Sequence, residues 1–206
     1  MNYFITAIGT DCGKTIFSAI LCEALHADYW KPVQAGLPRD AEVVKGLLTN
    51  TVSKIHPETY LLNTPASPHA AAKQDSIEIN MENFAIPKTK NNLIIEGAGG
   101  CLVPLNDRDF VIDLVKRFDS EIILVSNLYL GSINHTLLSA AYLKNQNYKV
   151  TGIVFNGKSN PESETIILRH TRLPCILRIE QEPMIDQEIV RRYAKQLKIN
   201  LVNEPS

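Results

Sequence analysis

Short runs of apolar residues recur along the chain and alternate with longer segments in which apolar residues follow a helical spacing. Runs rich in Ile, Leu and Val are typical of strands buried in a parallel sheet. They predict strands at residues 3–8, 28–31, 93–96, 122–126 and 150–155. The segments with helical spacing predict helices at residues 14–26, 110–118, 132–145 and 185–197.

The alternation of strands and helices indicates an α/β fold: a single domain over residues 1–206, with a mostly parallel β-sheet and helices on both faces. The segment from about residue 38 to 90 is less regular, so we expect it to wrap the edge of the sheet. In the helix at 132–145, Ser132 is expected to cap the first turn, and one apolar stripe is expected to be buried. That stripe consists of Ile133, Leu137, Leu138 and Ala141.

The composition is that of an ordinary globular domain, with 206 residues, 45% hydrophobic and 21% charged residues, and a formal charge of -1. This charge provides no general attraction to nucleic acid or to an anionic membrane. The first residues lack the features of a signal peptide, and no apolar stretch approaches the roughly 20 residues of a membrane span. The four cysteines form no C-x-x-C pair, which favours incidental thiols in a reducing compartment. We therefore expect a cytoplasmic protein that binds neither nucleic acid nor membrane.

The tripeptide Gly13-Lys14-Thr15 stands between a predicted strand and a predicted helix. Backbone N–H groups at a helix start bind anions, a lysine at this place reaches the β- and γ-phosphates of a nucleotide, and the threonine hydroxyl binds magnesium. The general pattern G-x-x-x-x-G-K-[ST] requires glycine where this chain has Ile8. The tripeptide alone is therefore a weak indication, and a plain strand-to-helix turn is its alternative.

Charged residues follow two other predicted strands. Glu96 ends the strand at 93–96, where an acid points into the crevice in which open α/β sheets bind ligands and is a usual partner of magnesium. Lys31 ends the strand at 28–31 and is suited to stabilise a transferred phosphoryl group. Asp40 offers a further oxygen to the metal. The plain alternatives are a solvated acid, an exposed loop lysine and a helix N-cap.

Taken together, these segments resemble the dethiobiotin synthetase family over residues 3–156, because five motifs occur in the family's order. The motifs are the loop of residues 3–15, which has the length of the family's modified phosphate loop, Lys31-Pro32-Val33, Ala66-Ser67-Pro68-His69, Glu96-Gly97-Ala98-Gly99-Gly100 and Leu130-Gly131-Ser132-Ile133-Asn134-His135. The resemblance implies a fold of the P-loop NTPase type and an ATP- and Mg²⁺-dependent enzyme. It also implies the reaction: carboxylation of 7,8-diaminononanoate with CO2 or bicarbonate and ring closure to dethiobiotin, through a carbamate and a carbamic-phosphoric anhydride.

The resemblance also implies roles for individual residues. The ATP-binding set comprises Asp11, Cys12, Gly13, Lys14, Thr15, Ile16, Asp40, Glu96, Gly97, Ala98, Gly99 and Asn156. The magnesium set comprises Thr15, Asp40 and Glu96, and the catalytic set comprises Lys31, Lys14, Thr10 and Asp11. The substrate set comprises Lys31, Ala35, Gly131, Ser132, Ile133 and Asn134. Asn156 would read the adenine edge, and the family's last nucleotide loop would fall near residues 179–182. A homodimer is implied, in which the 130–134 segment of one subunit receives the substrate carboxylate of the other.

Three positions depart from the family pattern. Ala7 stands where the family commonly has glycine, and Asp11 is shorter than the glutamate of many members. Ala35 stands where the family usually has a hydroxyl that contacts the diamine. We therefore expect this hydrogen bond to be absent or to be supplied by Gln34 or water.

Other classes of protein share the phosphate loop. A ParA-like ATPase switch would carry an extra lysine four residues before the last glycine of the loop, where this chain has Gly9. A cobyrinate-type amidotransferase synthetase would need a glutaminase domain, for which 206 residues leave no room. A small-molecule kinase remains as an alternative.

Overall fold

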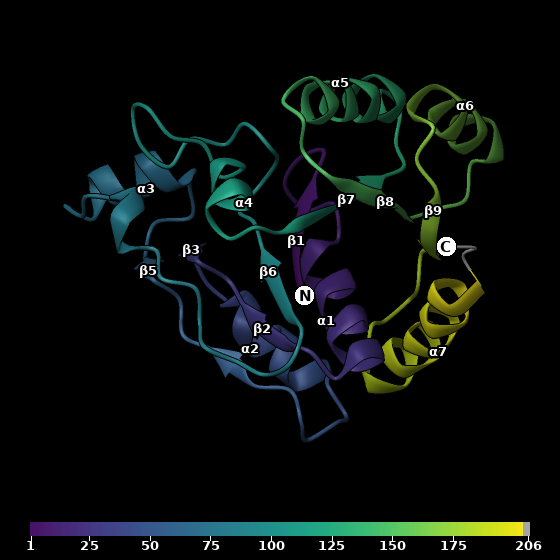
Figure 1. The fold of residues 1–206 in the computed structure, drawn as a ribbon, viewed down its shortest axis with the longest axis horizontal. Helices are drawn as coiled ribbons and strands as arrows, with labels where there is room; N and C mark the ends of the chain where they lie inside the picture. The colour runs from purple at the N-terminus through teal and green to yellow at the C-terminus, as the bar shows by residue number, and fades with distance from the viewer. Residues whose placement is uncertain (204–206) are drawn as a thin grey trace.

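A central parallel sheet organises the fold (Figure 1). The computed structural model describes residues 1–203, with side chains for residues 1–197. Residues 204–206, which the predicted domain includes, lie outside the described residues. The strand order is β4-β2-β6-β1-β7-β8-β9, and all neighbouring strands pair in parallel. The strands are β1 Asn2–Ala7, β2 Asp28–Trp30, β4 Ile55–His56, β6 Leu93–Glu96, β7 Glu121–Asn127, β8 Val150–Asn156 and β9 Cys175–Ile179.

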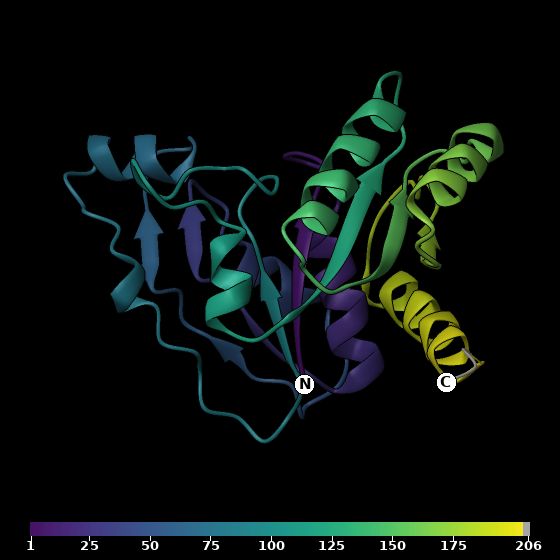
Figure 2. The same ribbon diagram turned by 45° about the horizontal axis from the view of Figure 1, so that its top comes forward.

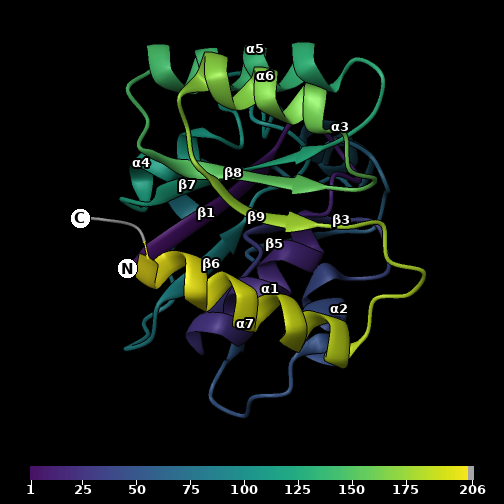
Figure 3. The same cartoon turned by 90° about the vertical axis from the view of Figure 1, so that its right-hand side faces the viewer.

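Helices cover both faces of this sheet, as Figure 3 shows with α5 and α6 above it and α1 and α7 below it. One face carries α1 Lys14–Leu25, α2 Asp40–Leu47 and α7 Gln187–Asn203. The other face carries α4 Asp113–Arg117, α5 Ser132–Asn145 and α6 Pro161–Thr171. The predicted single-domain α/β fold with a parallel sheet and helices on both faces is therefore confirmed.

The segment after β2 builds a small second layer beside the main sheet, visible as the blue strand pair in Figure 2. There β3 Val33–Ala35 pairs in parallel with β5 Tyr60–Leu62. The segment also contains α3 Pro68–Gln74, the short 3₁₀ helix η1 Met81–Asn83, and β4 at the edge of the main sheet. The prediction that residues 38–90 wrap the sheet edge is confirmed, although it gave none of these elements.

Side chains along β6 alternate between the two faces of the sheet, and this alternation sets the direction of Glu96. Ile94 packs into the hydrophobic cluster on the α1 side, whereas Ile95 packs into the cluster on the opposite side. Successive strand residues point to opposite faces, so Glu96 points to the same side as Ile94, toward the start of α1. The core therefore fixes the direction in which this acid points.

The structure corrects two expectations for α5. Its N-cap is Gly131, with φ 109°, and no side chain caps the helix, so Ser132 is not the cap. The buried face of α5 consists of Ser132, Thr136, Ala140 and Leu143 rather than the predicted stripe. Ala141 is exposed and Leu138 is 61% exposed. Small and polar residues allow the helix to approach β7, where the hydroxyls of Thr136 and Ser126 lie 2.7 Å apart.

Two further elements, α6 and β9, were not predicted. Only Ile167 of α6 is buried, and the apolar residues of this helix form the single run 166–168, which is too short to show a helical spacing. The strand β9 lies at the sheet edge and contains the half-buried Arg178. In the described part of the chain, none of the helices is both long and apolar enough to cross a membrane.

Candidate functional site

A cleft of about 680 Å³ lies at the carboxyl ends of β1, β2 and β6. This is where open α/β sheets bind ligands. Most of the residues that the sequence singles out line it: Thr10, Asp11, Cys12, Gly13, Lys14, Thr15, Ile16, Lys31, Ala35, Asp40, Glu96, Ala98 and Gly99. The structure therefore brings together residues from three separate segments of the chain.

The loop between β1 and α1 has the geometry of an anion site. Helix α1 begins at Lys14 and no side chain caps it, so its first N–H groups remain available to a ligand. Gly13 has φ 95°, and a Cβ there would lie 2.4 Å from Asn156 Nδ2, so the loop requires glycine at this position. Lys14 Nζ donates to Gly9 O at 3.1 Å, which folds the lysine back over the loop. Burial lowers the pKa of Lys14, and the charge of Glu96 only partly offsets this effect.

Glu96 connects the three segments of the cleft. Thr15 Oγ1 donates to Glu96 Oε1 at 2.9 Å, and Lys31 Nζ donates to the same oxygen at 3.0 Å. The other oxygen, Oε2, accepts a hydrogen bond from Tyr29 Oη at 2.9 Å. Glu96 is 1% exposed, and these three donors satisfy both of its buried oxygens.

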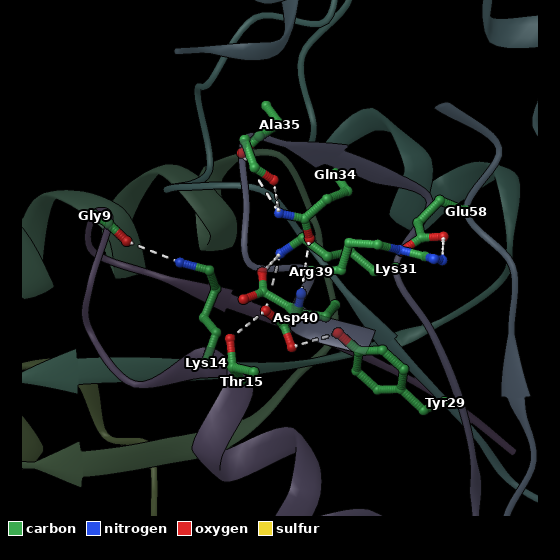
Figure 4. A network of polar contacts seen from close by, with 12 residues as sticks. Gly9, Lys14, Thr15, Tyr29, Lys31, Gln34, Ala35, Arg39, Asp40 and Glu58 are labelled. Carbon is green, nitrogen blue, oxygen red and sulfur yellow. Dashed lines mark hydrogen bonds and ion pairs between the residues drawn. The ribbon is translucent and has the colours of Figure 1, made fainter. Parts of the chain in front are cut away.

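Lys31 lies between two carboxylates. Its ammonium contacts Asp40 Oδ2 as well as Glu96 Oε1, and its side chain is buried. Burial alone would lower the pKa of Lys31, but the charges of Glu96 and Asp40 outweigh it and raise the pKa above its ordinary value. Figure 4 shows Thr15, Lys31 and Asp40 directed toward one region, whereas the ammonium of Lys14 points toward Gly9. The alternative of an exposed loop lysine is therefore wrong.

The turn that carries Asp40 is braced by Gln34. Gln34 Oε1 accepts from the backbone N–H of Asp40 at 3.1 Å, and Gln34 Nε2 donates to Gly36 O at 3.0 Å. Asp40 is the first residue of α2, and the N-cap is Arg39, so the alternative of Asp40 as an N-cap is wrong. Ala35 lines the cleft beside Gln34 and brings no polar side-chain atom to it.

Two predicted nucleotide residues lie next to the cleft lining. Asn156, at the end of β8, donates from Nδ2 to Cys12 O at 3.0 Å and so contacts the back of the phosphate loop. Gly97 lies below the cleft, where a Cβ would come within 3.0 Å of Phe4 Cε1. The loop at 179–182 is held to α7, because Tyr193 Oη accepts from the Glu180 N–H and donates to Glu182 Oε1.

The predicted substrate segment lies apart from the cleft. Gly131 and Ile133 line a different cavity of about 420 Å³, next to Lys158. Ser132 is buried and Asn134 is exposed. Within one chain the structure therefore does not bring Gly131, Ser132, Ile133 and Asn134 to the cleft.

The suitability of the cleft for a metal follows from its donor set. Thr15, Asp40 and Glu96 offer one hydroxyl and two carboxylates, which are the hard oxygen ligands that Mg²⁺ prefers. Over the residues that the structure describes, no group of three or more His, Cys, Asp or Glu side chains is arranged to hold a metal alone. A magnesium ion here would therefore take its other ligands from phosphate and water, as it commonly does.

Tyr29 is the contact that the sequence did not reveal. It lies inside β2 and reads there as an ordinary strand residue, without a motif around it. The signal is the strand order: Tyr29 pairs in register with Ile94, two residues before Glu96. Only the pairing of β2 with β6 makes this visible.

Comparisons with known proteins identify relatives of this chain. The family model described as "AAA domain" matches residues 1–189. The chain is 58% identical over 198 residues to the ATP-dependent dethiobiotin synthetase BioD of Cytophaga hutchinsonii, covering 95% of this chain and 96% of the relative. It is 46% identical over 202 residues to the protein of the same name from Christiangramia forsetii, covering 97% of each.

Solved structures with a similar fold are more distant in sequence. The septum site-determining protein MinD of Pyrococcus horikoshii, complexed with Mg-ADP, has a TM-score of 0.54 at 16% identity, covering 97% of this chain and 90% of that one. A ParA family ATPase of Chlorobium tepidum has a TM-score of 0.52 at 14% identity, covering 96% and 92%. At these identities the likeness concerns the fold alone.

Replacement of the loop lysine tests the anion site. Lys14→Ala is expected to abolish ATP-dependent turnover and leave the melting temperature within a few degrees of the parent, because the ammonium of Lys14 donates to a carbonyl of its own loop. Steady-state kinetics and thermal unfolding measure the two effects. Lys45→Ala, which alters an exposed lysine of α2, is the control. Near-normal turnover in Lys14→Ala would contradict the assignment of the phosphate loop.

Proposed function

Because the chain belongs to the family of ATP-dependent dethiobiotin synthetases, we propose that its cleft carries out the reaction of that family with the residues described above. The reaction is the ATP-dependent ring closure of diaminononanoate in biotin biosynthesis. The observation that carries the assignment of residues is the convergence of Lys14, Thr15, Lys31, Asp40 and Glu96 in one cleft. ATP is a substrate, and the finer roles below are our proposal.

The phosphates of ATP bind at the start of α1. The free N–H groups of the first turn and the ammonium of Lys14 supply donors and positive charge to them. Asp11, Cys12 and Ile16 line the same loop and contact the nucleotide through it, as do Ala98, Gly99 and, from below, Gly97. Asn156 would read the adenine edge through its Oδ1, because its Nδ2 donates to Cys12 O.

Thr15, Asp40 and Glu96 would hold a magnesium ion beside the phosphates. Bound there, it supplies positive charge that neutralises the transferred phosphoryl group. In the structure the carboxylates of Asp40 and Glu96 share the single positive charge of Lys31. A divalent cation would balance the negative charge that remains.

The chemistry begins with the diamine. One amine captures CO2 as a carbamate, and a carbamate oxygen then attacks the γ-phosphorus of ATP, forming a carbamic-phosphoric anhydride and releasing ADP. The second amine attacks the carbamate carbon, closes the cyclic urea and expels phosphate. Lys31 and Lys14 stand where a negative carbamate meets a negative phosphate, and they lower the repulsion between the two. Thr10 and Asp11 line the same end of the cleft and face the diamine.

The hydrogen bond that a hydroxyl at position 35 would donate to the diamine is absent in this chain. Both ends of the Gln34 amide are engaged, with Asp40 N–H and with Gly36 O, so Gln34 is not free to replace it. Either a water molecule takes the place of the hydroxyl, or the diamine contacts Ala35 through its apolar atoms. This change leaves the type of reaction unaltered and affects the affinity for the diamine.

The alternatives receive less support. The likeness to ParA and MinD proteins is distant, and Gly9 stands where the switch proteins would need lysine. A small-molecule kinase would share the phosphate loop and the lysines, but the full-length relatives at 46–58% identity carry the name of the synthetase. A cytoplasmic location, where ATP and reduced thiols are available, agrees with the reaction and stays a prediction.

A homodimer completes the substrate site. The helix start at Gly131–Ile133 does not reach the cleft of its own chain, yet Leu130 beside it is fully exposed and Leu138, two turns on, is 61% exposed. A helix N-terminus offers free N–H donors and a positive dipole end, which suit the carboxylate of the diamine. Contributed by the partner subunit, Gly131, Ser132, Ile133 and Asn134 bind this carboxylate.

The charge of Lys31 is tested by Lys31→Gln. We expect turnover to fall roughly a hundred- to a thousandfold, equivalent to about 3–4 kcal/mol, while the affinity for ATP changes little, because the charge acts mainly in the transition state. The measurement is ADP release that depends on both diamine and bicarbonate. Lys45→Gln is the matched control at an exposed lysine. A loss of turnover below about threefold would leave Lys14 as the only catalytic cation.

The magnesium ligands are tested by Glu96→Gln and Asp40→Asn. Each variant is expected to raise the magnesium concentration that gives half-maximal activity, because each removes an anionic oxygen from a cation that prefers such ligands. Glu42→Gln, at an exposed residue of α2, should leave the titration unchanged. Titrations of both site variants that overlay the parent curve would place the metal elsewhere.

The dimer is tested by sedimentation of the parent and of Leu138→Glu. The parent is expected to sediment as a dimer, and the variant, which places a charge on the exposed face of α5, should shift toward monomer with weaker binding of the diamine. Leu61→Glu, at a 45% exposed leucine of β5, controls for the added charge. A fully active monomer at working concentration would refute the proposal.

A further inference from the structure

We propose that Tyr29 is a positioning residue for the metal-binding carboxylate: its hydroxyl holds Glu96 Oε2 at the sheet and thereby leaves Oε1 directed to the cleft. The proposal rests on the function assigned above to Glu96. Tyr29 does not line the cleft, so any effect that it has on the reaction passes through Glu96.

The geometry of β2 and β6 produces this contact. Tyr29 and Ile94 are partners in the parallel register, so their side chains share the α1 face of the sheet with Glu96. The ring of Tyr29 is fully buried in the cluster below the cleft, and its hydroxyl emerges 2.9 Å from Glu96 Oε2. The phenol O–H is the donor of this hydrogen bond, and the carboxylate oxygen accepts it.

The two oxygens of the Glu96 carboxylate accept hydrogen bonds from different parts of the structure. Oε1 accepts from Thr15 and Lys31, both of which line the cleft, whereas Oε2 accepts from Tyr29 in the core. Without the hydroxyl, Oε2 would be a buried, charged oxygen without that donor, and the carboxylate would gain freedom to rotate. Mg²⁺ requires near-ideal octahedral geometry, so a rotated carboxylate binds it less well.

Tyr29→Phe tests the proposal, because phenylalanine keeps the ring in the core and removes only the hydroxyl. The probe is Mn²⁺, whose binding in the presence of a non-hydrolysable ATP analogue is measured by electron paramagnetic resonance. We expect its dissociation constant to rise about tenfold, within the 10- to 100-fold range typical for groups that orient a metal ligand. In kinetics, half-maximal activity should need more magnesium, saturating magnesium should restore most of kcat, and KM for the diamine should stay unchanged.

Two comparisons separate positioning from a general effect on the fold. Tyr60→Phe removes another buried tyrosine hydroxyl, which accepts hydrogen bonds from Asn80 N and Asn83 Nδ2 outside the cleft, and it should leave Mn²⁺ binding unchanged. In a Glu96→Gln background, Tyr29→Phe should add no further loss of Mn²⁺ affinity, because the group through which Tyr29 acts is already altered.

The outcomes are distinguishable. Equal Mn²⁺ affinities in Tyr29→Phe and Tyr60→Phe would overturn the role of Tyr29, and so would a failure of Tyr29→Phe alone to fold, which would assign the hydroxyl to stability. An independent loss in the Glu96→Gln background would also overturn it. If instead Glu96→Gln itself binds Mn²⁺ as the parent does, the metal site of the proposed function fails, together with this inference.

Discussion

The ion cluster of Lys31, Glu96 and Asp40, of which Lys31 and Glu96 are buried and Asp40 is partly exposed, is the interaction on which the cleft depends. Removing the ammonium of Lys31 and the carboxylate of Glu96 from water is costly unless each charge finds partners, and here each one does. The partners come from the ends of β2 and β6, from the start of α1 and from the turn before α2. The same contacts that satisfy the charges therefore hold four segments at one point of the sheet.

The cluster also explains how a lysine so firmly paired can act on a substrate. Lys31 contacts both carboxylates, and they raise its pKa, so it stays charged within the protein. It can turn to a carbamate only when Asp40 and Glu96 have another positive partner. In the proposed function, a divalent cation bound with the phosphates would meet this condition and would link nucleotide binding to the release of Lys31. Lys14, held by Gly9 O, would likewise be freed if phosphate replaced the carbonyl.

The sequence predicts most of what local patterns can encode. The strand Leu93–Glu96 and the helix Ser132–Asn145 have the expected bounds, because an apolar run and a helical period mark them. The prediction of the buried face of α5 is wrong, because small and polar residues pack on β7 while Leu138 faces outward. Lys14, Thr15, Lys31, Asp40 and Glu96 are indicated by residue type and position, whereas the other residues of the cleft are indicated by the resemblance to the family. Tyr29 was missed because its role depends on which strands are neighbours, and strand order is a property of the whole fold.

The departure from the family pattern at Ala35 is connected with the ion cluster through the neighbouring residue, Gln34. A hydroxyl at position 35 would serve the diamine, but this chain has none there. The neighbouring Gln34 is buried, and its amide fixes the turn from Gly36 to the first N–H of α2, where Asp40 stands. Releasing Gln34 toward the diamine would leave the Asp40 N–H without this acceptor and loosen one carboxylate of the cluster. Gln34 therefore serves the ion cluster, and in the proposed function the recognition of the diamine would depend correspondingly more on the helix start that a second subunit would contribute.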